Sequence, residues 1–350
     1  MSSTYLKFSS AGHVPEAVSP FRLEYLTLVE LEATRAANEG HILGAIAFGA
    51  EPPTLVTPDI PYAWVDMPVL GAGTMIETWS SVQPVIRDGA DGIVSARNDE
   101  VLFGCVQIEH PGSLDEASYI AYDRIFDFID SRGYAHLLRA WNYFPDINSP
   151  AEGLERYQRF CRGRHEAFST KGRIIGQDTP AASALGTRSG PLTVYFLAAK
   201  GPGERVENPR QTSAYHYPAQ YGPRSPTFSR GMLMQGGRGA LLFISGTAGI
   251  VGHETQHPGN AIDQARETIE NMRAVMAQAR VSATGGGRHT GRFALKAYVR
   301  RADYVPVVQR CLQKAFDEVT DVLYLQADIC RTDLLLEIEG VYFDEAGDPR

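Results

Sequence analysis

One order of strands and helices occurs twice along this chain of 350 residues, and that repetition restricts the fold more than any other feature. The first occurrence starts near Val101 and runs through VLFGCVQIEH, LDEASYIAYDRIFDFIDSRG, HLLRAWNYFPDI, GLERYQRFCRGRHEAF, ASALGT and LTVYFLAAK. The second runs through ALLFISGTAGIVG, NAIDQARETIENMRAVMAQAR, FALKAYVRR, YVPVVQRCLQKAFDEV, VLYLQADIC and LLLEIEGVYF. Apolar periodicity gives both the order β-α-β-α-β-β. We therefore expect two related α+β domains, each with helices on one face of a sheet.

The domain boundary is expected near residue 200. Residues 1–200 would form the N-terminal domain, whose first hundred residues look like an extension of short strands and turns. Residues 201–350 would form the C-terminal domain, preceded by a loop at 201–240 rich in Tyr, Pro and Arg. A long loop in a compact protein is commonly functional, so this loop is expected at the active site.

Composition narrows the class of protein. A hydrophobic fraction of 43% predicts an ordinary globular core, and a net charge of −8 argues against a nucleic-acid partner. No apolar run is long enough for a membrane helix, and the first residues lack the apolar core of a signal peptide. The protein is therefore expected in the cytoplasm. Its cysteines are interpreted as reduced thiols: Cys105, Cys161, Cys311 and Cys330.

The loop concentrates groups that suit a cyclic anion. Tyr215, His216 and Tyr217 precede a proline, and Tyr221 is followed by Arg224. Such residues provide aromatic walls, hydroxyl donors and a guanidinium for a carboxylate. An ordered surface loop with tyrosines packed on the domain below is an equally good interpretation.

Two further motifs carry weaker signals. The small residues 245–249, SGTAG, follow an apolar strand and predict either a tight turn or close approach of a ligand. The segment 253–257, HETQH, has the H-E-x-x-H spacing of a zinc helix, but Gly252 and Pro258 flank it. Polar turn residues are the favoured interpretation, and no metal is expected.

Glu337 and Glu339 alternate with apolar residues, so within a strand both side chains point to one face. Solvated carboxylates are the commoner outcome, whereas a buried one with a raised pKa would be a general acid. Several cations on predicted strands or helices are candidate carboxylate ligands, although such charges often face water: Arg139, Arg164, Lys296, Arg300 and Arg331.

Long motifs in the sequence resemble a known family. FISGTAGIVGHETQHPGN, LKAYVRR and CRTDLLLEIEG are similar to the RidA/YjgF-type fold. LLRAWNYFPDIN, PAASALGT and VENPRQTSAYHYPAQYGPRSPTFSRG resemble the chorismatase family more closely, over roughly residues 100–341. The resemblance implies two RidA/YjgF-like (chorismate-mutase-like) domains, each a mixed sheet with helices on one face, and an active site in a cleft.

The resemblance also implies a reaction and a set of site residues. Gly246 and Cys330 stand where hydrolase-type members tend to carry alanine, which is similar to the 3-hydroxybenzoate synthase type. Glu337 is then the expected proton donor to the enolpyruvyl methylene of chorismate, and the neighbouring ring hydroxyl displaces the ether. Glu337, Cys330 and Gly246 are thus the catalytic candidates. The substrate-binding candidates are Tyr215, Tyr221, Arg224, Arg164, Lys296 and Arg331.

This chemistry releases pyruvate without net water, so the enzyme would be a lyase, and it requires neither a metal nor an organic cofactor. Several alternatives remain open: a chorismate hydrolase giving a dihydroxycyclohexadiene carboxylate, formation of 4-hydroxybenzoate, a RidA-like imine deaminase, or a binding domain for aromatic acids. Chorismate is the expected partner, with no nucleic acid or membrane. The oligomeric state is left open between monomer and trimer.

Overall fold

The computed structural model describes residues 21–54, 60–109, 112–236, 239–281, 291–316 and 320–343. The first 20 residues, on which the signal-peptide expectation rests, lie outside the described part. No helix within that part is long and apolar enough to cross a membrane.

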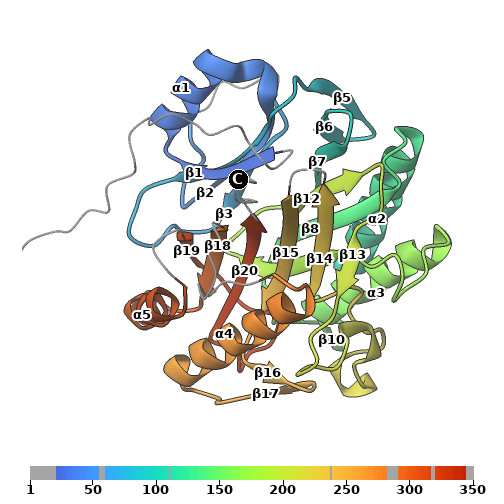
Figure 1. The fold of residues 1–350 in the computed structure, drawn as a ribbon. Coiled ribbons are helices and arrows are strands. Elements are labelled where there is room, and N and C mark those ends of the chain that lie inside the picture. The colour runs from blue at the N-terminus through green and yellow to red at the C-terminus, as the bar shows by residue number, and fades with distance from the viewer. Residues whose placement is uncertain are drawn as a thin grey trace, which may run out of the picture.

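The middle of the chain forms a six-stranded sheet in the order β11-β8-β12-β7-β6-β5 (Figure 1). Strands β8 and β11 are parallel, and the other pairs are antiparallel. Helix α2 begins after the N-cap Ser113 and ends before Gly133, whose φ of 77° suits glycine. The elements of this middle unit are β5 (Ile86–Ala90), β6 (Ile93–Arg97), β7 (Val101–Ile108), α2 (Leu114–Ser131), β8 (His136–Pro145), β9 (Pro150–Ala151), β10 (Leu154–Glu155), α3 (Arg156–Thr170), β11 (Ala181–Thr187) and β12 (Leu192–Ala199).

The C-terminal unit repeats the middle unit strand for strand, in the order β13-β14-β15-β20-β18-β19 with β18 and β19 parallel. Its elements are β13 (Glu204–Val206), β14 (Gly231–Gly236), β15 (Gly239–Thr247), β16 (Ile250–Val251), β17 (Glu254–Thr255), α4 (Ala261–Gln278), β18 (Arg292–Val299), α5 (Val305–Ala315), β19 (Thr320–Gln326) and β20 (Leu336–Phe343). The predicted fold class, two α+β units with mixed sheets and helices on one face, is confirmed.

The first hundred residues contain a third, shorter unit. It consists of β1 (Phe21–Leu26), α1 (Leu28–Asn38), β2 (Ile42–Gly49), β3 (Tyr62–Asp66) and β4 (Met75–Ser81). Its strand order β1-β4-β2-β3, with β2 and β3 parallel, matches β7-β12-β8-β11 of the middle unit. The expectation of strands and turns alone was wrong, because a capping box of Thr27 and Glu30 starts α1.

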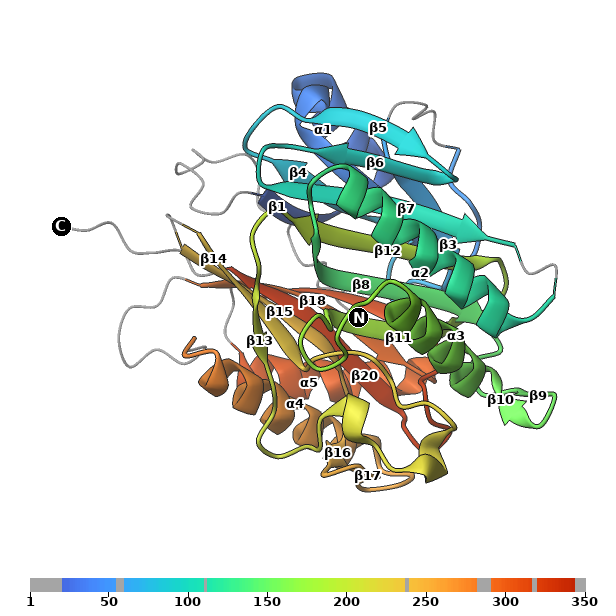
Figure 2. The ribbon, with the colours of Figure 1, turned by 90° about the vertical axis from the view of Figure 1, so that its right-hand side faces the viewer.

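The sheets of the three units face one another, and the helices lie on the outside of the molecule (Figure 2). The ends of β3, β11 and β19 meet in pairs: Arg188 N donates to Asp66 O at 3.0 Å, and β-bridges join Gly186 to Asp328 and Val69 to Leu325. The largest apolar cluster lies between the inner faces, while separate clusters lie under the helices. The change of sheet between β12 and β13 supports the domain boundary near residue 200, which stays a proposal.

Candidate active site

A cavity of about 300 Å³ lies between the middle and C-terminal units. This volume is at the small end of the range for small-molecule sites. Its walls come from α3, β11, the loop between β13 and β14, the end of β15, the segment between β19 and β20, and β20 itself. The polar and charged residues of the walls are Glu155, Tyr157, Gln158, Cys161, Arg164, Ser183, Tyr217, Gln220, Tyr221, Thr227, Arg230, Cys330, Arg331, Thr332, Asp333 and Glu337.

Glu337 supplies the acidic group of this cavity. Strand β20 is buried along its whole length, and Glu337 is only 4% exposed. Its Oε1 is buried without a hydrogen-bond partner among the described residues. Burial first, and the charge of Glu339 second, raise the pKa of Glu337 to about 8, although Arg139 and Arg230 act in the opposite direction. The carboxyl is therefore protonated near neutral pH.

Gly246 makes room for this carboxyl. The pairing of β15 with β20 is irregular between Ile244 and Thr247, which places Gly246 against the Glu337 side chain. A Cβ at position 246 would lie 1.9 Å from Glu337 Oε1 and 2.7 Å from its Cδ. Only glycine at this position allows Glu337 to keep its observed orientation.

The sulfur groups on the walls are neutral. Burial raises the pKa of Cys330 to about 12, and it raises the pKa of Cys161 to the same value. Tyr157 on α3 also lines the cavity, and burial raises its pKa well above the usual range. Cys330 is therefore a space-filling thiol rather than a thiolate nucleophile.

Three arginines give the walls positive charge. Arg164 on α3 is 3% exposed, lies over the ring of Tyr122, and has Nε and Nη2 without partners in the described chain. Arg230 donates from Nη2 to Tyr217 Oη at 2.7 Å, and its Nε is likewise unpaired within the described residues. Unpaired guanidinium groups at a buried cavity are suited to binding carboxylates.

Arg331 is the third arginine and is fixed from two sides. Its guanidinium lies 4.0 Å from the ring centre of Tyr221 and 5.3 Å from that of Tyr217. Its Nη1 donates to the carbonyl of His253 at 2.8 Å. The tyrosine loop and the β16–β17 hairpin thus meet on Arg331 at the cavity wall.

Six of the nine predicted site residues line the cavity together: Arg164, Tyr221, Gly246, Cys330, Arg331 and Glu337. The other three lie elsewhere. Tyr215 receives a hydrogen bond from Arg205 at 3.4 Å and packs near Gly176, while Arg224 is exposed. Neither placement supports the substrate-binding role predicted for these two residues.

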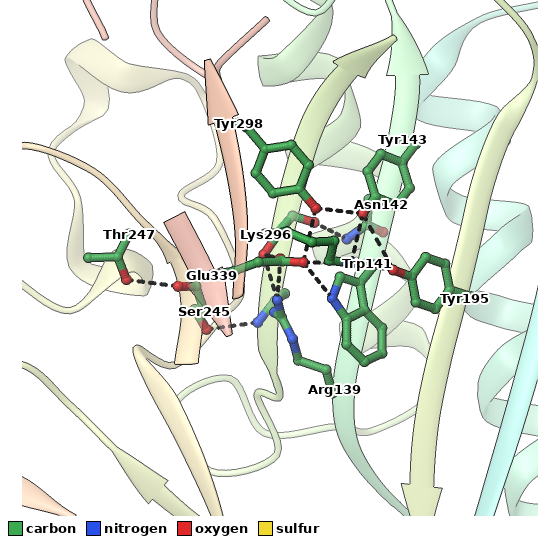
Figure 3. Close-up of polar contacts among 12 residues, drawn as sticks. Arg139, Trp141, Asn142, Tyr143, Tyr195, Ser245, Thr247, Lys296, Tyr298 and Glu339 are labelled. Atoms are coloured by element: carbon green, nitrogen blue, oxygen red, sulfur yellow. Dashed lines mark hydrogen bonds and ion pairs between the residues drawn. The ribbon is translucent and has the colours of Figure 1, made fainter. Parts of the chain in front are cut away.

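Lys296 also lies outside the cavity walls. Its ammonium donates to Glu77 at 2.6 Å and Tyr195 at 2.6 Å, and it contacts Glu339 at 2.8 Å (Figure 3). These contacts occupy the three N–H groups of the ammonium. Because the donors are used internally, the structure does not support Lys296 as a ligand of substrate.

Sequence reasoning missed Arg230 and gave Tyr217 no separate role, although both lie in the quoted loop motif. The signal for Arg230 was its position directly before β14, but nothing in the periodicity showed that the side chain points inward. Ser183, Gln158 and Thr227 were also missed.

The H-E-x-x-H segment contains β17 and the turn residues on either side of it, and it is not a helix. His253 Nδ1 contacts Tyr221 Oη at 3.2 Å, whereas His257 lies near Glu267. The two histidines have different neighbours. Among the described residues, no group of three His, Cys, Asp or Glu side chains could hold a metal ion.

A protonated buried carboxyl and arginine N–H groups without partners in the described chain, around a small cavity, define an acid–base enzyme for a small anion. Comparison with known proteins identifies the family. The family model described as chorismatase FkbO/Hyg5-like, N-terminal, matches residues 77–198.

The chain is 38% identical to a 3-hydroxybenzoate synthase of Streptomyces hygroscopicus, over 86% of this chain and 91% of the relative. It is 40% identical to a chorismatase of Streptomyces rapamycinicus, over 76% of this chain and 81% of the relative. A chorismatase crystal structure at 1.08 Å resolution, 34% identical, superposes with a TM-score of 0.81 over 92% of this chain and 98% of its own. The chain belongs to the chorismatase family.

Proposed function

We propose that this chorismatase converts chorismate to 3-hydroxybenzoate and pyruvate, with Glu337 as the acid. The observation that carries the proposal is the buried Glu337 carboxyl at a cavity walled by Arg164, Arg230 and Arg331. The name of the Streptomyces hygroscopicus relative supports the same product.

The first step is proton transfer from Glu337 to the terminal methylene of the enolpyruvyl ether. A pKa of about 8 keeps the proton on the carboxyl at neutral pH, yet makes it acidic enough to be given up to carbon. The oxocarbenium ion that forms is stabilised by the carboxylate left on Glu337.

The two carboxylates of chorismate require cationic partners. Arg164 and Arg230 line the cavity and have N–H groups without partners among the described residues, and Arg331 is held in place by Tyr221. We assign these three arginines to substrate carboxylates, with Tyr217 and Tyr221 beside the ring. Fixing both carboxylates presents the methylene to Glu337 in a reactive orientation.

The second step is displacement of the ether oxygen from the ring by the neighbouring ring hydroxyl. The bond from ring carbon to ether oxygen breaks and releases pyruvate, while the hydroxyl proton returns to Glu337. The epoxide that forms then opens to the phenol. No water is consumed, so the reaction is a lyase reaction. This displacement needs space for the Glu337 carboxyl and for the ring. We assign the provision of that space to Gly246 and the neutral thiol of Cys330.

Incubation with chorismate in oxygen-18 water tests both steps. We expect equal amounts of pyruvate and 3-hydroxybenzoate by chromatography, with no heavy oxygen in the phenol. Heavy oxygen in the phenol would exclude internal displacement, and a diene diol or 4-hydroxybenzoate as main product would exclude the proposed product. A 2-aminoacrylate-type imine assayed in parallel should not be turned over.

We further propose a cytoplasmic, monomeric enzyme. The monomer is supported by contacts within one chain. The ends of β3, β11 and β19 contact one another in pairs, so the sheet of each unit already has partners within the molecule. Light scattering coupled to size exclusion tests this: a mass near 38.4 kDa is expected, and three times that mass would contradict it.

A further inference from the structure

A second set of buried ionisable groups lies where the inner faces of the three units meet, and it includes Glu339, which is two positions from the proposed acid on β20 (Figure 3). We call it the charge cluster. Its members are Glu77 on β4, Arg139 on β8, Lys296 on β18 and Glu339 on β20.

Glu339 is the member on the same strand as Glu337. Two residues apart on β20, the side chains point to the same face, with Cα atoms about 6.5–7 Å apart. The two carboxyls differ in their partners. Glu339 forms ion pairs with Arg139 at 2.5 Å and with Lys296 at 2.8 Å, whereas Glu337 Oε1 has no hydrogen-bond partner in the described chain.

Neutral donors complete the shell of Glu339. Trp141 Nε1 and Tyr298 Oη each donate to Glu339 Oε1 at 2.9 Å, and Ser183 donates to Oε2. Burial alone would raise the pKa of Glu339, but Lys296 and Arg139 outweigh it and lower that pKa. Of the two neighbouring carboxyls, Glu339 is therefore the ionised one.

Lys296 connects Glu339 to the N-terminal unit. Its ammonium forms ion pairs with both Glu339 and Glu77. Glu77 is fully buried and accepts hydrogen bonds from Trp79 at 2.8 Å and from Tyr195 at 2.9 Å. Two carboxylates face two cations, so the charge cluster is electrically balanced. Ionisation of Glu337 would add an unbalanced negative charge to a buried region.

Further titratable and charged groups face Glu337 from the side of the cavity. Tyr157 and Cys330 are neutral because burial raises the pKa of each. Arg230 is positive and lowers the pKa of Glu337, so it acts against the effect of Glu339. The charged and titratable groups that face Glu337 or its cavity are Glu339, Arg139, Arg230, Tyr157, Cys161, Cys330, Arg164, Arg331, Glu155 and Asp333.

We infer that the charge cluster keeps the proton on Glu337, and that Glu339 and Glu77 are positioning residues for the acid. The inference rests on the proposed function of Glu337. It also gives the N-terminal unit a part in the chemistry, because Glu77 reaches the cluster from β4.

The test is to measure the pH midpoint of the Glu337 titration in the variants Glu339→Gln and Glu77→Gln. Each substitution is nearly isosteric and leaves the cluster with excess positive charge, which favours ionised Glu337. We expect the midpoint to fall by about one pH unit or more in Glu339→Gln, and by less in Glu77→Gln. Tyr195→Phe is the matched control: it removes hydrogen bonds to Glu77 and Lys296 but no charge, so its midpoint should stay where it is.

Two readouts separate the cluster from the proposed function. The first is the alkaline limb of kcat/KM for pyruvate release, where a midpoint that is lower by one pH unit reduces kcat/KM about tenfold. The second is the infrared band of the protonated Glu337 carboxyl, assigned by its loss in Glu337→Gln and titrated without substrate. The infrared titration tests the cluster even if chorismate is not turned over.

Lowered midpoints in both glutamine variants with an unchanged Tyr195→Phe support the inference. Unchanged or raised midpoints in both glutamine variants, with rates lowered equally at every pH, would overturn it. If Glu339→Gln fails to fold, Glu77→Gln alone decides, because Glu77 lies on a different sheet from the acid.

Discussion

Glu337 on β20 and Gly246 on β15 lie so close that a methyl group on Gly246 would overlap the carboxyl. At the scale of the residue, this contact links the proposed acid to Gly246, one of the two positions on which the reaction type is proposed to depend. The carboxyl is buried, Glu339 lies near it, and its Oε1 has no hydrogen-bond partner in the described chain, all of which favours its protonated form.

Replacing Glu337 by Gln removes the proton and preserves the size of the side chain. We expect kcat to fall by about 10²–10⁴-fold, the usual contribution of a positioned general acid. Glu254→Gln on the exposed β17 is the matched control and should leave kcat unchanged. Pyruvate release from chorismate measures both, and near-normal turnover by Glu337→Gln would remove Glu337 from the mechanism.

Replacing Gly246 by Ala should displace the Glu337 carboxyl, because the new Cβ would lie 1.9 Å from Oε1. We expect lower turnover and a smaller share of 3-hydroxybenzoate among the products, measured by chromatography. Gly73→Ala is the control, since a Cβ at position 73 has no atom of the described chain within 4 Å. An unchanged rate and product in Gly246→Ala would contradict the proposed role of this contact.

At the scale of the element, the loop between β13 and β14 contributes tyrosines of two kinds. Tyr217 lines the cavity and bonds to Arg230, whereas Tyr215 bonds to Arg205 away from the cavity. Tyr215 lies in the short 3₁₀ helix Ala214–His216, and Tyr217 is the extended residue that follows it, so the two tyrosines have different surroundings.

This difference predicts opposite results for two equal substitutions. Tyr217→Phe removes a hydrogen bond to a buried guanidinium, worth about 1.5–3 kcal/mol, and should raise KM for chorismate about tenfold or more. Tyr215→Phe should leave KM within about twofold, because its bond is long and neither Tyr215 nor Arg205 lines the cavity. Steady-state kinetics checks both, and equal effects would show that the loop acts only as a whole.

The elements were largely predictable from the sequence, but side-chain directions were not. Apolar periodicity predicts the helices α2, α3, α4 and α5 and the strands of the two repeats, whereas β13 and β14 lie in the segment 201–240 that was expected to be a loop. The helix α1 was missed although Thr27 and Glu30 form a capping box, since no long apolar stripe follows them. The inward direction of Arg230 depends on how the loop returns to β14, which no local pattern records.

At the scale of the whole molecule, the limits of prediction are those of long-range pairing. Lys296 appeared to be a ligand for substrate, but the third unit brings Glu77 to it across 219 positions of the sequence. The shared strand order of β1–β4 is visible only once β2 pairs with β3 and β4. When the partner is so distant in the sequence, a single sequence does not distinguish a buried, paired lysine from any other cation on a strand.

The raised pKa of Glu337 should also be measurable as a pH dependence of the stability of the whole protein. An unfolded chain ionises this carboxyl near its ordinary pKa of 4.5, whereas the folded protein keeps the proton up to about 8. Between these values the folded state binds more protons than the unfolded state, so this group makes the protein less stable as pH rises through that window. Below the window both states are protonated, and above it both are ionised.

Glu337→Gln has no proton to lose, so the variant should escape this decline. We expect its free energy of unfolding, relative to the native protein, to increase from about pH 5 to about pH 8 by up to a few kcal/mol. Urea denaturation across that range measures the difference, with Glu254→Gln expected to run parallel to the native curve. Parallel curves for Glu337→Gln as well would mean that burial on β20 does not raise the pKa of Glu337, because a carboxyl with its ordinary pKa leaves no such slope.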